Sequence, residues 1–496
     1  MQTQLRTNEI EPTDNISFPI GTILLVARLY DVLNFHAIFG KHKTRGIDIN
    51  KLLQALISYK LTDNFSIKRS HEWITRPEVL AEFNLPSFSE RTLYRVLEIL
   101  GVNRDEIISD LQDVLFARYA FEHTNINMDW TSIVLHGTEA KLGKYGYSRD
   151  HRPDKKQITV GVTELADPIH VPIGMTIEPG NLNDQMHFKK TYRQSRDRLR
   201  EGSLVIFDKG ANSVANIHMI RADQLQYITG KKLNKSDDKI IAAFETYHPQ
   251  VIDAESGIRG IIIEKPSSTN YLYFSEKLQN EQLESRARKV VREIQEAKAI
   301  QESIDKKKSL PKRFRINNLL VDVDYSIQTK LLELSEEDAV KLLEEKFITG
   351  REGFFCLKSS KKLTLTEALL TYRKKDSIEK IFNSLKNEIE IKPLRVWTDN
   401  SIYGALIIGF IAQLFVSLIR FEIPELKHTS TKFIKQALLN LTVTIDSWMR
   451  KTKKYIHSNF DAINTMILRH NWAISGSGRG EKTNWQSLYP DEILKA

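Results

Sequence analysis

Three carboxylates occupy positions from which they could act together on a metal ion. Asp129 lies in a β-rich segment where strand alternation favours an apolar or neutral residue. Asp208 directly follows the apolar run 204–207, and Glu379 lies in a helical segment after the next β-rich one. Ligand sites of open α/β sheets lie at the carboxyl ends of strands, and oxygen ligands of this kind suit Mg²⁺ or Mn²⁺. Two such ions, roughly 3.5–4 Å apart, activate a water and stabilise the leaving oxygen in an in-line phosphoryl transfer.

The segment 371–389 is predicted to be one amphipathic helix that presents Glu379 along an edge. At 100° per residue, four side chains fall within an arc of about 60° beside the apolar stripe: Tyr372, Lys375, Glu379 and Lys386. Solvated charges need no such alignment, so it favours a site over an ordinary amphipathic helix. The other basic residues of the segment are expected to be ordinary solvated charges: Arg373, Lys374 and Lys380.

The first 120 residues are predicted to be helical. Segments 20–35 and 48–61 carry apolar residues at helical spacing. In segment 87–101, Ser87 and Glu90 form a capping-box pattern, and Gly101 suits a C-cap. Arg91 and Arg95 leave this helix on a side away from its apolar stripe. A helix-turn-helix DNA reader and a plain helical hairpin both fit this pattern.

From about residue 124 the pattern is that of an α/β protein with a mixed sheet. Segments 126–137, 156–165 and 170–180 are predicted to form an antiparallel meander. The strand at 204–207, a helix from Ser213 and a strand at 225–230 then form a β-α-β unit. Residues 231–350 read as an insertion of charged helices and short strands, one of them at 317–328, with a basic cluster over 306–315 that is expected to be solvated.

Composition sets wider bounds on the protein. A chain of 496 residues exceeds the size of a single hydrophobic core, so two or three lobes are expected. The excess of 72 Lys and Arg over 63 Asp and Glu favours a polyanionic partner. The single cysteine, Cys356, excludes an intramolecular disulfide and a thiolate metal cluster. The apolar stretch 404–419 is predicted to be a buried helix, and no signal peptide is recognised, so we expect a soluble cytoplasmic protein.

Four blocks of the sequence resemble a DDE transposase of prokaryotic insertion sequences, in the subgroup with a Y-x2-R-x3-E-x6-K signature. Here the signature reads Tyr372, Lys375, Glu379 and Lys386, with lysine where arginine is usual. "YGYSRDHRPDKKQITVGVTE" resembles the stretch after the first catalytic aspartate, and "LVIFDKGANS" resembles the block around the second. "PLRVWTDNSIYGALIIGFIA" resembles the segment after the signature helix. The resemblance covers about residues 20 to 450.

The resemblance implies an α/β fold with an RNase H-like mixed-sheet catalytic core, a helical N-terminal domain and an α/β insertion domain. Asp129, Asp208 and Glu379 would be the catalytic residues and the ligands of two divalent metal ions, Mg²⁺ with Mn²⁺ as a substitute. The expected domains are a helical DNA-binding domain, the first part of the core, the insertion, the second part of the core and a helical C-terminal region: 1–120, 121–230, 231–350, 351–425 and 426–496.

The expected partner is double-stranded DNA, namely the terminal inverted repeats of the element and the target. By the resemblance, Tyr372, Lys375 and Lys386 grip phosphates, although lysine at 375 lacks the bidentate fork of arginine. A basic strip with interleaved tyrosines could track a DNA backbone and stack on an unpaired base, where the alternative is a solvated hairpin loop. The DNA-binding candidates outside the signature are Tyr145, Tyr147, Arg149, Arg152, Lys155, Arg91 and Arg95.

The function expected from these features is that of a cut-and-paste transposase. It would cleave strands at the ends of an insertion sequence and transfer them to target DNA, as a homodimer in the synaptic complex, associated with the nucleoid and with no membrane. The alternative is a non-catalytic DNA-binding relative that acts as a regulator. A housekeeping RNase H-like nuclease would not explain the N-terminal lobe and the insertion.

Overall fold

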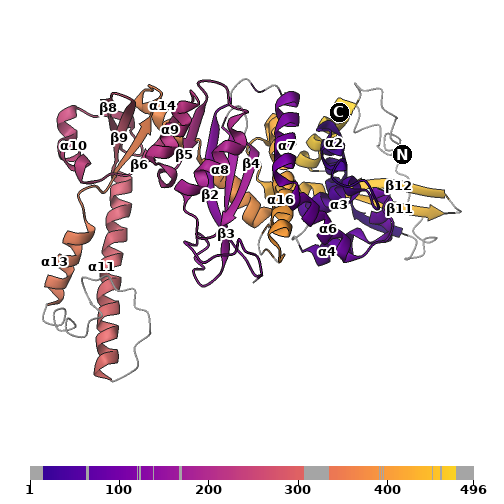
Figure 1. The fold of residues 1–496 in the computed structure, drawn as a ribbon, viewed down its shortest axis with the longest axis horizontal. Helices are drawn as coiled ribbons and strands as arrows, with labels where there is room; N and C mark the ends of the chain where they lie inside the picture. The colour runs from indigo at the N-terminus through magenta and orange to yellow at the C-terminus, as the bar shows by residue number, and fades with distance from the viewer. Residues whose placement is uncertain are drawn as a thin grey trace. The chain divides into compact units, whose positions relative to one another are not determined.

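A computed structural model describes residues 15–475, apart from 63–65, 120, 122–123, 138, 167–169, 307–334, 390, 392–393, 395, 449–450 and 459–460. The chain divides into two compact units (Figure 1). The first unit combines Met1–Gln226 with Arg373–Ala496, and the second is Tyr227–Tyr372. The first unit is therefore built from segments on both sides of an insertion.

The first unit contains a mixed sheet whose strand order is β4-β3-β2-β5. The strands β2 (Ile126–Val134), β3 (Gln157–Leu165) and β4 (Val171–Pro179) form an antiparallel meander, and β5 (Leu204–Phe207) runs parallel to β2. All four residues of β5 are buried. The predicted meander and the predicted buried strand are both confirmed.

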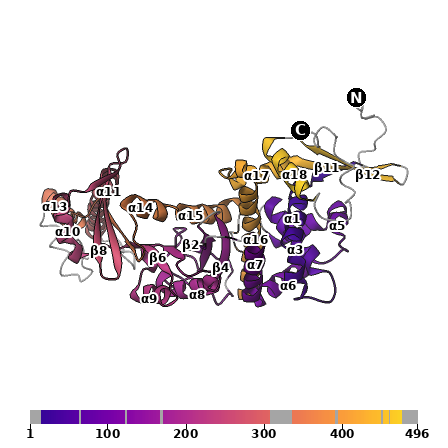
Figure 2. The same ribbon diagram turned by 90° about the horizontal axis from the view of Figure 1, so that it is seen from above.

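Helices cover both faces of this sheet (Figure 2). On one face, α8 (Asp184–Arg196) packs closely, and Trp130 Nε1 donates a hydrogen bond to Thr191 Oγ1 at 3.0 Å. A Cβ atom at Gly161 would lie 2.6 Å from Thr191 Oγ1, so glycine permits this approach. The opposite face takes α15 (Asp376–Asn383). Because side chains alternate along β2, Trp130 faces α8 while Asp129 faces α15.

The helix that was predicted from Ser213 is also present in the first unit. It is α9 (Val214–Ala222), and the Ser213 side chain accepts a hydrogen bond from the backbone N–H of Asn216 at 3.1 Å. This cap satisfies one of the free N–H groups of the first turn. The cap follows Asp208 by only a few residues, so it fixes the chain just beyond the end of β5.

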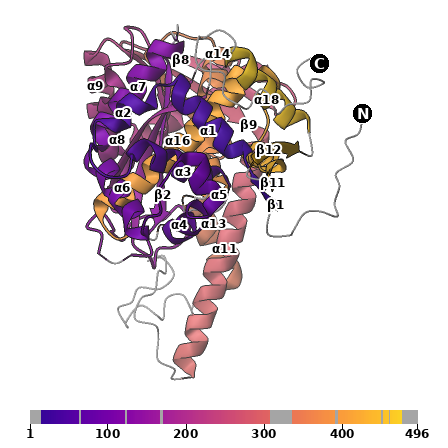
Figure 3. The ribbon, with the colours of Figure 1, turned by 90° about the vertical axis from the view of Figure 1, so that its right-hand side faces the viewer.

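The N-terminal helices of the first unit pack against one another and, through α3, α6 and α7, against one buried helix, α16 (Asp399–Glu422). They are α1 (Gly21–Val32), α2 (Phe35–Gly40), α3 (Ile49–Thr62), α4 (Ile67–Ile74), α5 (Pro77–Phe83), α6 (Glu90–Val102) and α7 (Arg104–Tyr119). In Figure 3, α3 lies beside α16, which also contacts α6 and β4, while α1 packs on α3. By length and composition α16 could span a membrane, but its apolar stretch is entirely buried in the protein. The prediction of a buried helix is confirmed.

Two details of the predicted helix at 87–101 are wrong. The N-cap of α6 is Ser89, not Ser87, and no side chain caps the helix there. Gly101 is not a C-cap, because the helix continues to Val102. A Cβ atom at Gly101 would lie 2.0 Å from the backbone oxygen of Asn400, so this glycine allows α6 to pack closely on α16. Its role depends on a residue almost 300 positions away, which local patterning does not reveal.

The ends of the described chain contain strands that were not predicted. After α17 (Thr431–Asn440) come β11 (Leu441–Trp448), β12 (Lys451–Ser458) and α18 (Ala462–Ser475). Near the N-terminus, β1 (Asn15–Pro19) pairs antiparallel with β11 in the order β1-β11-β12. The N-terminal and C-terminal regions are therefore not purely helical. The pairing partner of β1 lies more than 400 residues away, which explains why local sequence gave no signal.

The second unit is an α/β module with an antiparallel sheet in the order β6-β10-β9-β8-β7. Its strands are β6 (Gln226–Lys231), β7 (Gln250–Asp253), β8 (Ile258–Lys265), β9 (Ser268–Ser275) and β10 (Phe354–Ser359). Its helices are α10 (Asp238–Ala242), α11 (Glu276–Asp305), α13 (Glu336–Phe347) and α14 (Leu365–Arg373). In Figure 1, α11 and α13 lie side by side, and Val290, Leu343 and Phe347 form a buried cluster between them.

The second unit extends beyond the predicted insertion at 231–350. The strand β10 was assigned to the core, but it pairs with both β6 and β9 and so belongs to the second unit, which ends at Tyr372. A strand that resumes a β pattern does not reveal which sheet it will join. The expected strand at 317–328 and the basic cluster beyond Lys306 lie outside the described residues.

Candidate active site

A lysine side chain links two of the three predicted carboxylates. Lys375 Nζ lies 3.2 Å from Asp129 Oδ2 and 3.3 Å from Glu379 Oε1. The Lys375 side chain is only 8% exposed and Asp129 is 14% exposed, whereas Glu379 is 64% exposed. The ammonium group therefore fills the space between the strand β2 and the helix α15.

The third carboxylate, Asp208, acts on the same ammonium group. Met128 pairs with Phe207 in the parallel register of β2 and β5, so Asp208 follows β5 alongside Asp129. Burial opposes the charge of Lys375, but Asp129, Asp208 and Glu379 attract it, and the net result is a raised pKa for the Lys375 ammonium. Carboxylates from three separate elements thus act on one buried cation, whereas the sequence predicted that Lys375 would contact phosphate; the metal-binding role of the three carboxylates stays a prediction.

Asp129 is a buried carboxylate with a raised pKa. Burial raises its pKa, while the charge of Lys375 and the backbone N–H of Trp130, 2.9 Å from Asp129 Oδ1, partly offset this effect. A nearby cation stabilises the charged form of a buried carboxylate, because it replaces part of the lost hydration. The site therefore favours positive charge.

A second buried carboxylate, Glu164 on β3, fixes α15 against the sheet. It is fully buried and lies opposite Asn127 in the register of β2 and β3. Glu164 Oε2 accepts hydrogen bonds from Ser377 Oγ at 2.7 Å and from Asn127 Nδ2 at 3.0 Å. Asn127 and Asp129 share one face of β2, and Ser377 is two residues before Glu379. This network therefore couples the strand and the helix that carry two of the carboxylates. The sequence analysis did not identify Glu164.

The segment 371–389 is not the single helix that was predicted. The helix α14 ends at Arg373, α15 begins at Asp376, and a π-helical turn, η5 (Ser384–Glu388), follows. A projection at 100° per residue does not hold across these breaks. Tyr372 belongs to the second unit, whereas Lys375, Glu379 and Lys386 belong to the first.

Lys386 has a carboxylate partner of its own. Its Nζ lies 3.1 Å from Asp150 Oδ1, and the two side chains are 11% and 15% exposed. Asp150 lies in the loop between β2 and β3, in the predicted basic strip. The predicted phosphate-binding lysine is thus held against this loop.

The predicted DNA-binding strip has exposed aromatic residues and paired arginines. Tyr145 and Tyr147 are 62% and 85% exposed. Arg149 pairs with Asp184 at 2.7 Å. The remaining strip residues lie at the surface as well: Arg152, paired with Asp154 at 2.8 Å, and Lys155, partly exposed. Two exposed tyrosines suit stacking, while the ion pairs leave less free charge than the sequence suggested.

On α6, Arg91 and Arg95 are both exposed, on the side away from the buried stripe. The stripe itself is confirmed, because Leu93, Val96 and Leu97 are buried. The exposed side is available to a partner.

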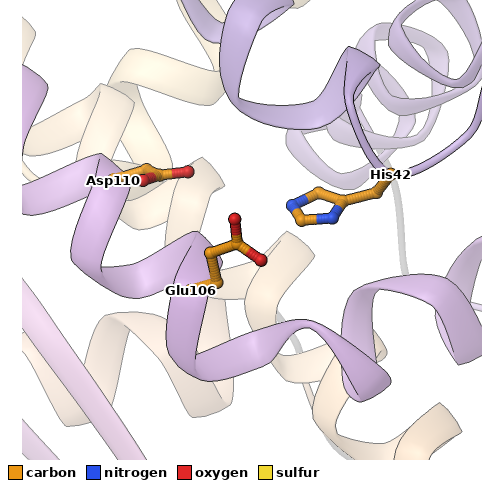
Figure 4. Close-up of side chains that lie close together, drawn as sticks. All are labelled: His42, Glu106 and Asp110. Carbon is orange, nitrogen blue, oxygen red and sulfur yellow. The ribbon is translucent and has the colours of Figure 1, made fainter.

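A different group of side chains brings potential metal ligands closer together. Ligand atoms of His42, Glu106 and Asp110 all lie within 4.8 Å of one another (Figure 4). Glu106 and Asp110 are one turn apart on α7. Their i, i+4 spacing is the only feature of the sequence that could have indicated this group, and the sequence analysis did not use it. Lys41 Nζ already lies 2.6 Å from a carboxylate oxygen of each. A lysine therefore satisfies this group.

The three predicted carboxylates fit a divalent cation. Carboxylate oxygens are the ligands that Mg²⁺ and Mn²⁺ prefer, and here they surround a buried positive charge. Asp129, Asp208 and Glu379 offer only oxygen donors, which suit a hard metal ion.

Comparison with known proteins adds to this geometry. Residues 121–415 match the transposase DDE domain. The chain belongs to this transposase family. The matched segment contains Asp129, Asp208 and Glu379, and DDE transposases generally use divalent metal ions. The resemblance to DDE transposases is thereby confirmed, while the prokaryotic subgroup and its signature remain predictions.

One solved structure similar to this transposase is a piggyBac transposase synaptic complex with hairpin DNA, determined by cryo-EM. The identity is 8%, the TM-score is 0.41, and the alignment covers 98% of this chain and 86% of that one. At this level of similarity the match does not establish a shared fold. No curated protein sequence matches the chain.

Proposed function

We propose that this transposase cleaves DNA strands at the ends of an insertion sequence and transfers them to target DNA. The observation that carries the proposal is the convergence of Asp129, Asp208 and Glu379 on the buried Lys375 ammonium, inside the segment that matches the family. The mixed sheet with Asp208 at the carboxyl end of β5 supports an RNase H-like core.

Asp129, Asp208 and Glu379 would hold two divalent ions, Mg²⁺ or Mn²⁺. When bound, such ions supply an activated water and stabilise the leaving oxygen of an in-line phosphoryl transfer. Hydrolysis breaks a phosphodiester bond and leaves a 3′-OH, which then attacks a phosphodiester of the target. The chain's own groups position these events, because Glu164 and Ser377 fix α15 and hence Glu379 relative to Asp129.

Lys375 has a distinct part in this scheme. Its ammonium balances the carboxylates and keeps them together, since three close negative charges would otherwise repel one another. The side chain is long and flexible, so it can turn toward a DNA phosphate when other cations neutralise the carboxylates. Lys386, held by Asp150, would present its charge from the neighbouring loop.

Strand cleavage tests the proposal directly. Glu379→Gln should abolish Mg²⁺-dependent nicking of DNA that carries the element's own ends, while binding of those ends stays nearly intact. Glu425→Gln, which changes another exposed glutamate of the first unit, serves as the control and should cleave normally. A Glu379→Gln protein that still nicks DNA with Mg²⁺ would refute the assignment.

The same experiment addresses the alternative, a non-catalytic DNA-binding regulator. Wild-type protein that binds the ends but never cleaves them would favour the regulator. We also propose that two copies act together, because transposition joins two ends. Sedimentation of the complex with two DNA ends should give at least two protomers, and a single protomer would contradict the proposal.

A further inference from the structure

A basic cavity lies beside α15, on a different side of the helix from Glu379. Its volume is about 650 Å³, within the range of about 300–1,000 Å³ that small-ligand sites occupy. From α15, the residues Asp376, Ser377 and Lys380 line it, whereas Lys375 and Glu379 do not. The rest of the wall comes from the end of α16, the loop after it and the start of α17, with further residues from α15, η5 and the segments just before β4 and before α15: Ile381, Asn383, Ser384, Glu388, His170, Arg373 and Lys374.

The charge of the cavity is predominantly positive. Five Lys or Arg side chains line it against two carboxylates, Asp376 and Glu388. At the rim, Arg373, Lys380 and Lys427 are exposed, and none of them has an ion pair with another residue in the described part of the chain. Arg373 and Lys380 are two of the three basic residues of segment 371–389 that were expected to be ordinary solvated charges.

At the cavity wall, Arg420 is a partly buried guanidinium without a carboxylate bonded to it among the described residues. Its Nε donates to the backbone oxygen of Thr429 at 2.8 Å, and its Nη2 donates to Thr431 Oγ1 at 2.9 Å. Burial lowers the pKa of Arg420, and the charge of Glu388 opposes this. A guanidinium that loses water without gaining a bonded anion is stabilised by any anion that enters.

The start of α17 adds to this preference. Thr429, Ser430 and Thr431 line the cavity, and Ser430 caps the ten-residue helix by accepting a hydrogen bond from the backbone N–H of Phe433. The positive end of the helix dipole therefore faces the same space as Arg420. The Arg420 guanidinium, the start of α17 and the rim lysines would all stabilise an anion bound in the cavity.

We propose that this cavity binds a phosphate of a DNA strand, with the attached nucleoside in the remaining space. A polyanion explains why the rim charges are exposed, since neighbouring phosphates can pair with them outside the cavity. The proposal rests on the proposed function, because DNA is the substrate there. Ser377 lines the cavity and also bonds to Glu164, so a strand held here lies next to the network that positions Glu379.

The test compares two variants that remove equal charge. Lys380→Gln with Lys427→Gln removes two rim charges, and Lys189→Gln with Lys239→Gln removes two exposed lysines that do not line the cavity. Binding to end DNA is measured by fluorescence anisotropy in EDTA over a range of salt concentrations. The rim variant should bind about tenfold more weakly, and its slope of log K against log salt should be smaller by about 2. The control variant should behave as wild type.

Each outcome has a defined meaning. Equal affinity and equal salt slopes for the rim variant and wild type would overturn the proposal. A second result would also overturn it: the rim variant loses binding of labelled inorganic phosphate but keeps wild-type affinity for DNA. The cavity would then bind only a small anion. The assay needs no cleavage, so failure of the proposed enzymatic function leaves its result readable.

Discussion

Two lysines of the first unit each contact two carboxylates, and their surroundings differ. Lys41 lies 2.6 Å from both Glu106 and Asp110, and its side chain is 41% exposed. Lys375 lies farther from its partners, at 3.2 and 3.3 Å, but is only 8% exposed. The shorter contacts belong to the more exposed lysine.

The two lysines differ more in burial than in distance, and burial decides how much each ion pair contributes to stability. In water an ion pair gains little, because solvent screens both charges and long side chains lose freedom. In the interior, removal of one partner leaves a charge without solvent. The group with the closest ligand atoms, His42, Glu106 and Asp110, is therefore not the better candidate for a catalytic metal site.

The largest expected effect separates the two lysines by stability. Lys375→Met should lower the free energy of unfolding by about 3 kcal/mol in EDTA, because Asp129 loses its buried counter-charge. Lys41→Met should cause no measurable change. Urea denaturation followed by fluorescence measures both, and equal effects of the two substitutions would contradict the role of burial.

A second comparison concerns two histidines. Burial lowers the pKa of His187 to about 3, whereas the pKa of His42 is lowered less strongly. The unfolded chain binds a proton to His187 near pH 6.5, so its contribution to stability is complete above pH 6.5 and is lost as the pH falls toward 3. From pH 7.5 to pH 5 the loss is about 2 kcal/mol. His187→Gln should flatten this pH dependence in urea denaturation, and His42→Gln should leave most of it. The prediction fails if His42→Gln flattens it equally.

Metal binding provides a third comparison. Mg²⁺ at about ten times its Kd should stabilise the wild-type protein by about 1.4 kcal/mol. Asp129→Asn should abolish the rise in melting temperature, while Asp110→Asn should retain it, because only the first substitution alters the proposed site. Differential scanning calorimetry measures the shift. Loss of the shift in Asp110→Asn alone would assign the ion to the exposed group instead.

The smallest effect concerns the positioning of α15. Ser377→Ala removes the hydrogen bond to Glu164, along with the contacts of the same hydroxyl to the Lys374 backbone oxygen and Asn127 Nδ2, and should slow Mg²⁺-dependent cleavage by about fivefold to tenfold. The Mg²⁺ concentration for half-maximal rate should rise as well, since Glu379 is held less firmly. Ser89→Ala, at an exposed serine that caps nothing by its side chain, is the control. A normal rate and a normal Mg²⁺ requirement for Ser377→Ala would show that Glu164 does not position the helix.

Much of the fold followed from local patterns. Alternating apolar residues predicted the meander of β2 to β4, a short apolar run predicted β5, and an apolar stretch predicted buried α16. Asp129, Asp208 and Glu379 were predicted to be metal ligands from their positions in a strand, directly after a strand and in a helix. Such features are visible because periodicity and burial act over a few residues.

Only the tertiary structure revealed the rest. Lys375 was predicted to grip phosphate, but it contacts Asp129, which is 246 residues away in sequence. Glu164, Arg420 and the strand β1 likewise depend on partners from distant segments. The break between α14 and α15 and the π-helical turn changed which side chains share a face. The sequence by itself determined the strand that carries Asp129 and the strand that Asp208 follows, because local periodicity decides strand formation; metal binding by these residues stays a prediction. The tertiary structure decided which charge is buried beside which, because long-range packing sets solvent exposure.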